Sequence, residues 1–244
     1  YTFFIKKYYF LICCFSKKIF VLEKVFKKRL TGLKVNENKI AVVPHGVDIK
    51  FDVKENKNKP QSLLYFGFLT WYKGVDWLVE NITNENKLII AGGPSANLKQ
   101  KKHYKLFLNK LIKKIKTKKN ITLTGFVKES KIKNYFNNSE IVVFPYRRMI
   151  SSSGPLSLVF SFEKPFILSR PLEGYFESED FQEALKETGL KKEDFLFDLN
   201  PESFEKRLSW ARKNLDKLST FSQIMKQKRS WGKVARRYFE ILTS

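Results

Sequence analysis

The sequence contains very little cysteine and histidine. Its 244 residues include two cysteines, adjacent at Cys13 and Cys14, and two histidines, His45 and His103. Adjacent cysteines do not readily reach the geometry of a structural disulfide with each other, so the composition is typical of a reducing compartment. A structural zinc site is excluded, because the chain lacks the spaced cysteine or histidine pairs that supply its ligands.

Long hydrophobic runs are also missing. The apolar stretch 8–15 is shorter than the roughly 20 residues that a membrane-spanning helix needs, and lysines bracket it on both sides. No small-residue cleavage site follows it, which argues against a secretory signal peptide. We expect the stretch to pack against a further domain or to lie at a membrane interface. The expected location is the cytoplasm, with peripheral contact to the cytoplasmic membrane face as the alternative.

Acidic residues are few relative to basic ones. There are 24 Asp and Glu against 47 Lys and Arg, which gives a formal charge of +23. Such a field attracts the phosphates of nucleic acids, anionic lipids and nucleotides alike. Many of the lysines lie within residues 99–119, where apolar residues recur at helical spacing. This amphipathic pattern has two interpretations, a solvated surface helix or a contact with an anionic membrane.

Apolar residues, by contrast, are plentiful. Hydrophobic residues make up 43% of the chain and include 23 phenylalanines, enough to build a core. Short runs rich in β-branched and aromatic residues alternate with helical patterns. The predicted strands are 40–43, 63–66, 88–91, 121–124, 141–144 and 166–168, and the predicted helices are 75–81, 98–118, 130–137 and 155–162. This alternation predicts the α/β class, with a Rossmann-like parallel sheet covered by helices on both faces.

The chain divides into three parts. Residues 52–61 are polar and rich in lysine without periodicity, which is typical of an exposed connection. We place the boundary near Ile49, so that residues 1–49 form a first, incomplete module and residues 50–220 form the Rossmann-like domain. Residues 221–244 carry a single apolar stripe and predict a carboxyl-terminal helix that packs on another part of the protein.

Glycine and serine clusters follow four of the predicted strands. The first runs from Gly67 to Gly74 and contains Lys73 close to a helix start, and the second, residues 151–154, supplies a helix cap before Pro155. Glycine lets the backbone approach a phosphate, and a helix N-terminus attracts an anion. Each cluster alone also fits an ordinary turn or an ordinary helix cap.

The other two clusters are the weaker turns 92–94 and 125–127. In a parallel sheet all four loops lie at the same edge, because they follow the carboxyl ends of the strands. Four small-residue loops at one edge, together with Lys73 and the pair Arg147 and Arg148, favour a phosphorylated ligand.

The order of these segments resembles the carboxyl-terminal domain of the retaining GT-B glycosyltransferases. That large family (glycosyl transferases group 1, family 4) includes phosphatidylinositol mannosyltransferases and sucrose-phosphate synthases. The resemblance covers about residues 16–242 and is carried by the segments 43–48 (Val-Pro-His-Gly-Val-Asp), 66–74, 89–94 and 153–165. It implies that residues 1–49 are a remnant of the amino-terminal, acceptor-binding domain, and that residues 221–244 form the helix crossing back to that domain.

The resemblance also implies a donor site for a nucleotide-diphosphate sugar. Lys73 and the backbone amides of Ser152, Ser153 and Gly154 would bind the diphosphate, with Phe126 and Val127 beside the nucleobase. The remaining expected contacts are Gly67, Thr70, Gly93, Arg147 and Arg148. No cofactor and no metal ion are expected, since cations and a helix terminus can stabilise the leaving group and the chain lacks an Asp-x-Asp sequence.

The sequence departs from the family at several positions. The arginine expected shortly after Gly67 is replaced by Phe68 or Thr70, and Arg147 or Arg148 could substitute for it. The paired glutamates of the family fall on Ile150 and Leu158, so the contact to the ribose is unassigned. No catalytic residue is assigned either, because the resemblance leaves that residue to the amino-terminal domain.

Three functions remain open at this point. The first is a sugar transfer with retention, in which this chain supplies the donor-binding half and a longer chain or a separate one completes the site. The second is a non-catalytic nucleotide-binding or scaffold module of the same fold. The third is a basic nucleic-acid-binding protein, although no recognised nucleic-acid-binding motif is present and no specific nucleic acid is expected as a partner.

Overall fold

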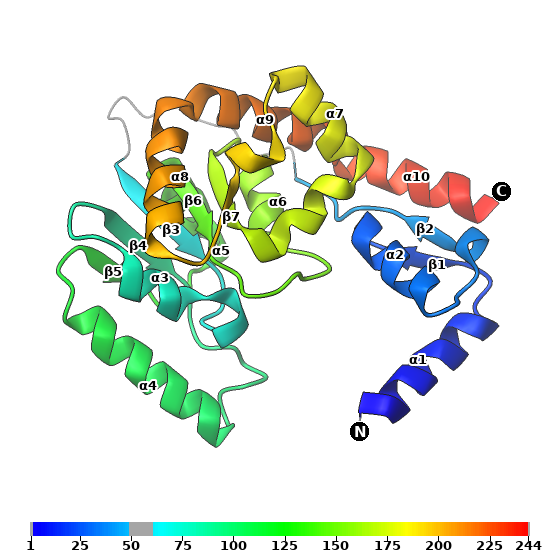
Figure 1. Cartoon of the computed structure of the whole chain (residues 1–244), viewed down its shortest axis with the longest axis horizontal. Coiled ribbons are helices and arrows are strands. Elements are labelled where there is room, and N and C mark those ends of the chain that lie inside the picture. Colours follow the sequence, from blue (N-terminus) through cyan, green and yellow to red (C-terminus); the bar gives the residue numbers. More distant parts are fainter. Residues whose placement is uncertain (1, 49–60, 244) are drawn as a thin grey trace.

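A computed structural model describes residues 2–48 and 61–243 of the chain. The predicted boundary near Ile49 and most of the predicted connection 52–61 lie outside these described residues. Within them, residues 61–228 form the larger part, here called the sheet domain, and residues 16–48 form a small amino-terminal module (Figure 1). Two further helices, α1 (Thr2–Phe15) and α10 (Trp231–Thr243), extend from the two ends of the chain.

The sheet domain is built on six parallel strands in the order β5-β4-β3-β6-β7-β8. The strands are β3 (Ser62–Phe66), β4 (Lys87–Ala91), β5 (Ile121–Leu123), β6 (Ser139–Phe144), β7 (Phe166–Ser169) and β8 (Leu196–Phe197). The central strands are almost wholly buried and rich in branched apolar residues, as expected of a parallel sheet covered on both faces. The chain leaves β3 toward β4 and β5 and later returns on its other side, so the topological switch point lies between β3 and β6.

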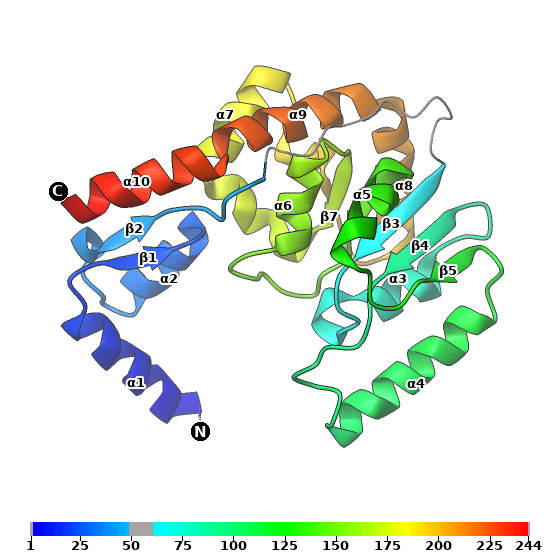
Figure 2. The same cartoon turned by 180° about the vertical axis from the view of Figure 1, so that it is seen from behind.

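Helices cover both faces of this sheet (Figures 1 and 2). On one face lie α3 (Val75–Asn81), α4 (Lys102–Lys116) and α8 (Pro201–Lys213). On the other lie α5 (Glu129–Asn137) and α6 (Gly154–Ser161), with α7 (Glu179–Thr188) and α9 (Leu215–Lys228) packed beside α6. Short 3-10 helices join these elements: η2 (Trp71–Lys73), η3 (Arg170–Glu177) and η4 (Lys192–Asp194). The predicted α/β class with helices on both faces is confirmed.

Aromatic residues fill the space between α6, α7, α9 and the sheet. Phe166 of β7 is fully buried and its ring contacts those of Phe160, Phe195 and Phe221 at centroid distances of 5.8, 5.0 and 6.0 Å. Tilted and edge-on ring pairs of this kind stabilise a fold by more than the burial of their apolar area alone would. About half of the 23 phenylalanines of the sequence are buried in this core.

The amino-terminal module is much smaller. It consists of β1 (Ile19–Val21), α2 (Lys24–Gly32), the 3-10 helix η1 (Glu37–Lys39) and β2 (Ile40–Val42), and its two strands pair in parallel. The predicted strand 40–43 is therefore present, but it belongs to this separate sheet. Helix α10 packs against the module, with the rings of Phe20 and Tyr238 4.8 Å apart.

The predicted single stripe 221–244 is divided between two helices. Helix α9 ends at Lys228 and α10 begins at Trp231, with Arg229 and Ser230 between them. At this break the N–H of Val47 donates to the carbonyl of Arg229 at 2.7 Å, and Val47 forms a parallel bridge with Ser230. The two stretches of chain that join the module to the sheet domain thus run side by side.

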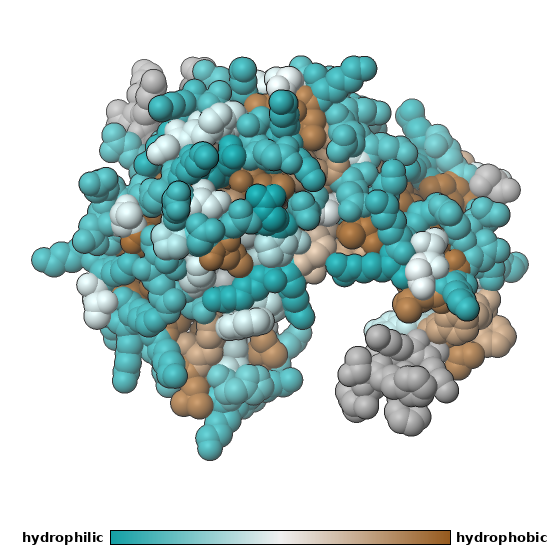
Figure 3. All heavy atoms as spheres, viewed as in Figure 1, coloured by the Kyte–Doolittle hydropathy of each residue, from teal (hydrophilic) through white to brown (hydrophobic). Residues whose placement is uncertain are grey.

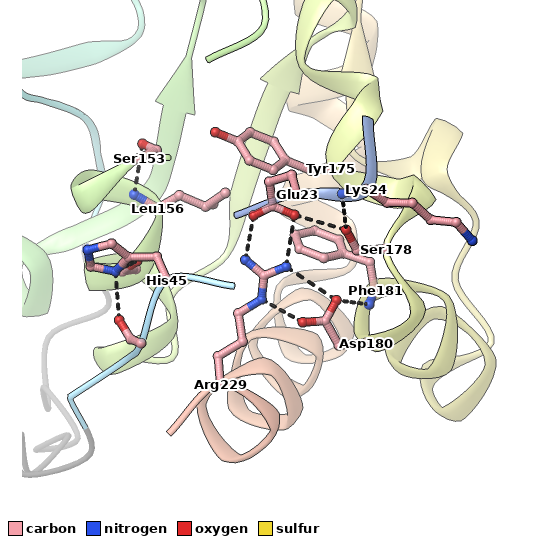
Figure 4. A network of polar contacts seen from close by, with 12 residues as sticks. Glu23, Lys24, His45, Ser153, Leu156, Tyr175, Ser178, Asp180, Phe181 and Arg229 are labelled. Atoms are coloured by element: carbon pink, nitrogen blue, oxygen red, sulfur yellow. Dashed lines mark hydrogen bonds and ion pairs between the residues drawn. The ribbon is translucent and has the colours of Figure 1, made fainter. Parts of the chain in front are cut away.

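A buried ionic network joins the two parts at the same place (Figure 4). The guanidinium of Arg229 donates to both oxygens of Glu23, at 2.7 and 3.1 Å, and to both oxygens of Asp180, at 2.6 and 3.2 Å. The Ser178 hydroxyl adds a hydrogen bond to Glu23 at 2.9 Å. Burial raises the pKa of Glu23 and the Arg229 charge opposes that rise. Since Glu23 precedes α2 and Asp180 lies in α7, the network ties the module to the sheet domain.

Candidate functional site

The loops that follow β3, β4, β5 and β6 meet at the carboxyl edge of the sheet. The N–H groups of Gly67 and Leu69 donate to the carbonyls of Ala91 and Gly93, at 3.1 and 3.0 Å. A Cβ atom on Gly92 would lie 1.8 Å from the carbonyl oxygen of Gly67, so only glycine allows these two loops to approach so closely. The predicted convergence of the small-residue loops is confirmed.

Lys73 is the central charge at this edge. It is only 7% exposed, and its side chain makes no ion pair or hydrogen bond among the described residues. Its Nζ lies 5.5 Å from the ring centroid of Tyr146, and a Cβ added to Gly67 would lie 3.0 Å from that Nζ. Burial lowers the pKa of Lys73 from 10.5 to about 8. A buried cation without a counter-ion is energetically unfavourable unless an anion binds beside it.

No carboxylate of the described residues forms an ion pair with Lys73. Burial raises the pKa of the Tyr146 hydroxyl, so this group stays neutral at physiological pH. Phe68 lies on another side of the ammonium, with its ring centroid 6.0 Å from Nζ. The position of Gly67 also faces Pro155, which brings Lys73 close to the first turn of α6.

The first turn of α6 has the expected cap. Ser153 is the N-cap residue, and its hydroxyl accepts a hydrogen bond from the N–H of Leu156 at 3.2 Å. Pro155 has no N–H, so the amides that remain for a ligand are those of Ser152, Ser153 and Gly154, which make no hydrogen bond within the described part of the chain. Free amides at a helix N-terminus favour a phosphate group. The role of the three amides as phosphate ligands stays a prediction.

The two arginines after β6 differ in their environment. Arg147 forms a bidentate ion pair with Asp76, at 2.7 and 2.9 Å, so its charge is already compensated. Arg148 is exposed, forms no ion pair among the described residues, and lies 4.5 Å over the ring of Tyr72. Of the two, Arg148 is better placed to act as the second cation, and both assignments stay predictions.

The remaining predicted contacts lie around the same edge. Phe126 is 75% exposed in the loop after β5, whereas Val127 packs against the core. The Phe126 backbone nitrogen would lie 3.1 Å from a Cβ on Gly93, so the loops after β4 and β5 touch. Thr70 is buried at the start of η2, and its Oγ1 has no hydrogen-bond partner among the described residues.

A neighbouring cavity was not predicted from the sequence. It has a volume of about 350 Å³ and lies along α6, lined by His45, Phe66, Gly154, Ser157, Leu158 and Trp231 among others. The Nδ1 atom of His45 lies 2.8 Å from the carbonyl oxygen of Gly46 and 3.1 Å from the hydroxyl of Ser157. A Cβ on Gly46 would lie 2.3 Å from the Trp231 ring, so this ring packs directly on the backbone. Only a long-range contact brings Trp231 here, and no local pattern signals it.

Neither a metal-binding cluster nor a membrane-spanning helix is found among the described residues. Across residues 2–48 and 61–243, no group of three or more His, Cys, Asp and Glu side chains is placed to hold a metal ion. Within the same residues, no helix has both the length and the apolar character needed to cross a bilayer.

A parallel six-stranded α/β domain with its small-residue loops gathered at the switch point is the architecture of a GT-B glycosyltransferase domain. The chain belongs to the family of glycosyl transferases group 1, whose profile matches residues 47–214. This membership confirms the predicted glycosyltransferase group. No curated protein matches the sequence significantly.

Solved structures share the fold at low sequence identity. A glycosyltransferase from Rickettsia africae has a TM-score of 0.71 at 18% identity, covering 97% of this chain and 65% of that one. The Anabaena protein HepE, solved with UDP and glucose, has a TM-score of 0.69 at 12% identity over 94% and 64%. Sucrose-phosphate synthase from Thermosynechococcus elongatus has a TM-score of 0.71 at 13% identity over 98% and 60%. The chain therefore spans less than two thirds of the length of these proteins.

Proposed function

We propose that this chain binds a nucleotide-diphosphate sugar at the carboxyl edge of its sheet and supplies the donor-binding half of a retaining glycosyltransferase. The observation that carries the proposal is Lys73, a buried ammonium with no counter-ion among the described residues, placed beside the free amides that open α6. A diphosphate would supply the missing negative charge. Membership of glycosyl transferases group 1 and the UDP in HepE support the same ligand class.

The proposed chemistry is stabilisation of the leaving group. When the bond between the sugar and the diphosphate breaks, negative charge develops on the phosphate oxygens. Lys73 and the amides of Ser152 to Gly154 are fixed in advance, and the burial of Lys73 strengthens its interaction with that charge. Arg148 would add a second positive charge from the loop after β6. This arrangement requires no metal ion.

We further propose that catalysis needs more than the described residues. The amino-terminal module contains two parallel strands only, whereas parallel sheets normally have more strands and are covered on both faces. The similar solved structures are also longer than this chain. An additional amino-terminal domain, in the same chain or in a separate one, would complete this sheet and contribute the acceptor site.

Calorimetric titration with UDP, GDP and ADP tests the donor site directly. We expect at least one of them to bind, and Lys73→Met to weaken that binding at least tenfold. Lys164 offers a matched control, since burial also lowers its pKa to about 8 but it lies between α6 and β7, at the opposite edge of the sheet. Lys164→Met should bind with unchanged affinity. Absence of binding for all three nucleotides, or equal losses in both variants, would overturn the proposal.

One observation favours a non-catalytic nucleotide-binding module as the second candidate. The two positions where the resemblance places glutamates hold Ile150 and Leu158, and Leu158 lines an apolar part of the cavity beside α6. A chain that binds nucleotide tightly, yet releases no nucleoside diphosphate from any sugar nucleotide when the additional amino-terminal domain and acceptors are supplied, would support this second function.

A further inference from the structure

Positive charge is concentrated in one part of the sheet domain. Residues 86–128 contain twelve lysines and not a single aspartate, glutamate or arginine. Helix α4 lies in the middle of this segment and carries six of these lysines over fifteen residues. This segment alone therefore contributes +12 of the formal charge of +23.

The structure separates the two sides of α4. Its apolar side is buried against the sheet through Tyr104, Leu108, Leu111 and Ile115. The opposite side is exposed, and we call it the α4 lysine face; it comprises Lys102, Lys105, Leu106, Lys110, Lys113 and Lys116. Of the lysines in α4, only Lys114 forms an ion pair among the described residues, with Glu80. The five lysines of the face therefore keep their charge available to a partner.

The shape and composition of this face favour a lipid surface over a nucleic acid. The lysines lie along one straight helix, and lysine attracts phosphate as a point charge without the bidentate geometry by which arginine reads a base. The face carries no exposed aromatic ring on which a base could stack, and its central apolar residue is Leu106, which is 55% exposed. Anionic lipid attracts each nearby lysine, and the attractions add over the face.

A second helix lies at the same margin of the molecule. In both views of the ribbon, α1 and α4 occupy the lower margin, on either side of the gap between the two parts (Figures 1 and 2). Tyr8, Tyr9 and Phe15 of α1 are 64, 62 and 85% exposed. Figure 3 shows long hydrophilic side chains over α4 and hydrophobic residues gathered around the module near α1. Exposed tyrosine and phenylalanine beside a basic surface are typical of contact with a membrane interface.

We propose that the α4 lysine face docks this protein onto the surface of a bilayer that contains anionic lipid. Because the apolar side of α4 is already used by the core, the attachment is electrostatic and α4 does not insert. It should therefore be reversible and sensitive to salt, since exposed charges are screened within about 8 Å at physiological ionic strength. This proposal does not depend on the proposed donor site.

Vesicle sedimentation with matched variants tests the docking. The α4 variant replaces four lysines of the face by glutamine: K102Q, K105Q, K110Q and K113Q. The control variant removes the same charge from exposed lysines of α7, α8 and α9 that form no ion pair among the described residues: K186Q, K206Q, K213Q and K217Q. The probes are vesicles of phosphatidylcholine alone and of phosphatidylcholine with 30% phosphatidylserine, in 0.1 M and 0.5 M NaCl.

We expect the unaltered protein to sediment with the anionic vesicles only, and to be released in 0.5 M NaCl. The partition coefficient should fall at least tenfold in the α4 variant and less than twofold in the control variant. Equal losses in both would show that net charge alone is responsible and would overturn the proposal. So would equal binding to both kinds of vesicle, or a single-stranded RNA that displaces the protein from anionic vesicles and loses affinity in the α4 variant. If both variants bind nucleotide with unchanged affinity, the loss of vesicle binding does not arise from damage to the donor site.

Discussion

The sheet domain and the amino-terminal module are held together by different means. In the sheet domain the central strands are buried throughout, and aromatic rings such as those of Phe166 and Phe195 contact one another in a continuous apolar core. In the module, no residue of α2 is fully buried and the three residues of β1 are only half-buried. Its firmest attachment is ionic, through Glu23 and Arg229.

The two parts should therefore differ in their free energy of unfolding. Regions with few buried apolar contacts open at lower free energy than a packed core does. The sheet domain should unfold cooperatively, while the module depends on α10 and on a single charged residue, Arg229, at the break before that helix.

The same truncation should have very different effects in the two parts. Phe166→Ala removes a fully buried ring from the core, and should lower the free energy of unfolding by about 3 to 5 kcal/mol. Phe20→Ala removes a half-buried ring that contacts Tyr238, and should lower it by about 1 kcal/mol. Urea denaturation measures both values. Similar losses in the two variants would show that the module is as well packed as the sheet domain.

Arg229→Met should destabilise the module and leave the sheet domain folded. The variant leaves Glu23 and Asp180 without their cation, and breaking a buried ion pair by removing one partner destabilises by about 3 to 5 kcal/mol. Since Glu23 has a raised pKa, it can take up a proton, and we expect a loss near the lower limit. Hydrogen exchange should show β1 and β2 losing protection while β3 and β6 keep it. Uniform loss of protection would contradict the distinction between the two parts.

Nucleotide binding should belong to the sheet domain and should depend on pH through Lys73. The pKa of this lysine in the folded protein is about 8, so its positive charge is present below that pH and is lost above it. The dissociation constant for a nucleoside diphosphate should therefore rise about tenfold per pH unit above pH 8, which is about 1.4 kcal/mol. Titration calorimetry between pH 7 and 9.5 measures this slope, and Lys73→Met should abolish it.

The stability of the ligand-free protein should change in the opposite direction. The pKa of Lys73 is 10.5 when unperturbed and about 8 in the folded state, so the unfolded chain binds more protons between these values. The unfavourable contribution of the buried charge is complete below pH 8 and is relieved as the pH rises toward 10.5. Thermal unfolding of the unaltered protein and of Lys73→Met, compared at pH 7.5 and 9.5, isolates this term. If the difference in Tm between the two proteins is as large at pH 9.5 as at pH 7.5, Lys73 is not the buried charge responsible.

The smallest expected effect concerns the cap of α6. Ser153→Ala removes the hydroxyl that accepts from the N–H of Leu156, and should lower stability by about 1 kcal/mol. Asn200→Ala removes the equivalent cap of α8, where the side chain accepts from the N–H of Ser203 at 2.9 Å. Both variants should lose similar stability in urea, but only Ser153→Ala should weaken nucleotide binding. Equal affinity in the two would argue against a ligand at the start of α6.

Local patterns were sufficient to predict most of the sheet domain. The strands β3, β4, β5, β6 and β7 and the helices α3, α4, α5 and α6 lie within a few residues of the predicted ranges, whereas no prediction covered α7. Strands β8 and β1, of two and three residues, were not predicted. The strand at 40–42 was predicted, but its separate sheet was not, because strand pairing depends on contacts distant in the sequence.

The loops around the proposed site could be predicted in outline, whereas the ion pairing and burial of their charged residues could not. The loops and the cap at Ser153 follow from glycine and serine patterns, whereas nothing local distinguishes the paired Arg147 from the unpaired Arg148. The burial of Lys73 likewise depends on Tyr146, which lies 73 residues later in the chain. The break between α9 and α10 is fixed by the pairing of Arg229 with Glu23, which is 206 residues away in the sequence. Such contacts leave no trace in the spacing of neighbouring residues.

The two crossings between the parts have a mechanical consequence. A single covalent connection permits rotation about several axes. Here the stretch ending at Val47 and the stretch at Arg229 and Ser230 are joined by a backbone hydrogen bond and a parallel bridge. Together they form a two-segment hinge. Two segments paired in this way bend about one axis more easily than they twist. Any swing of the module toward the Lys73 edge should therefore have one degree of freedom, with the same surfaces meeting at every closure.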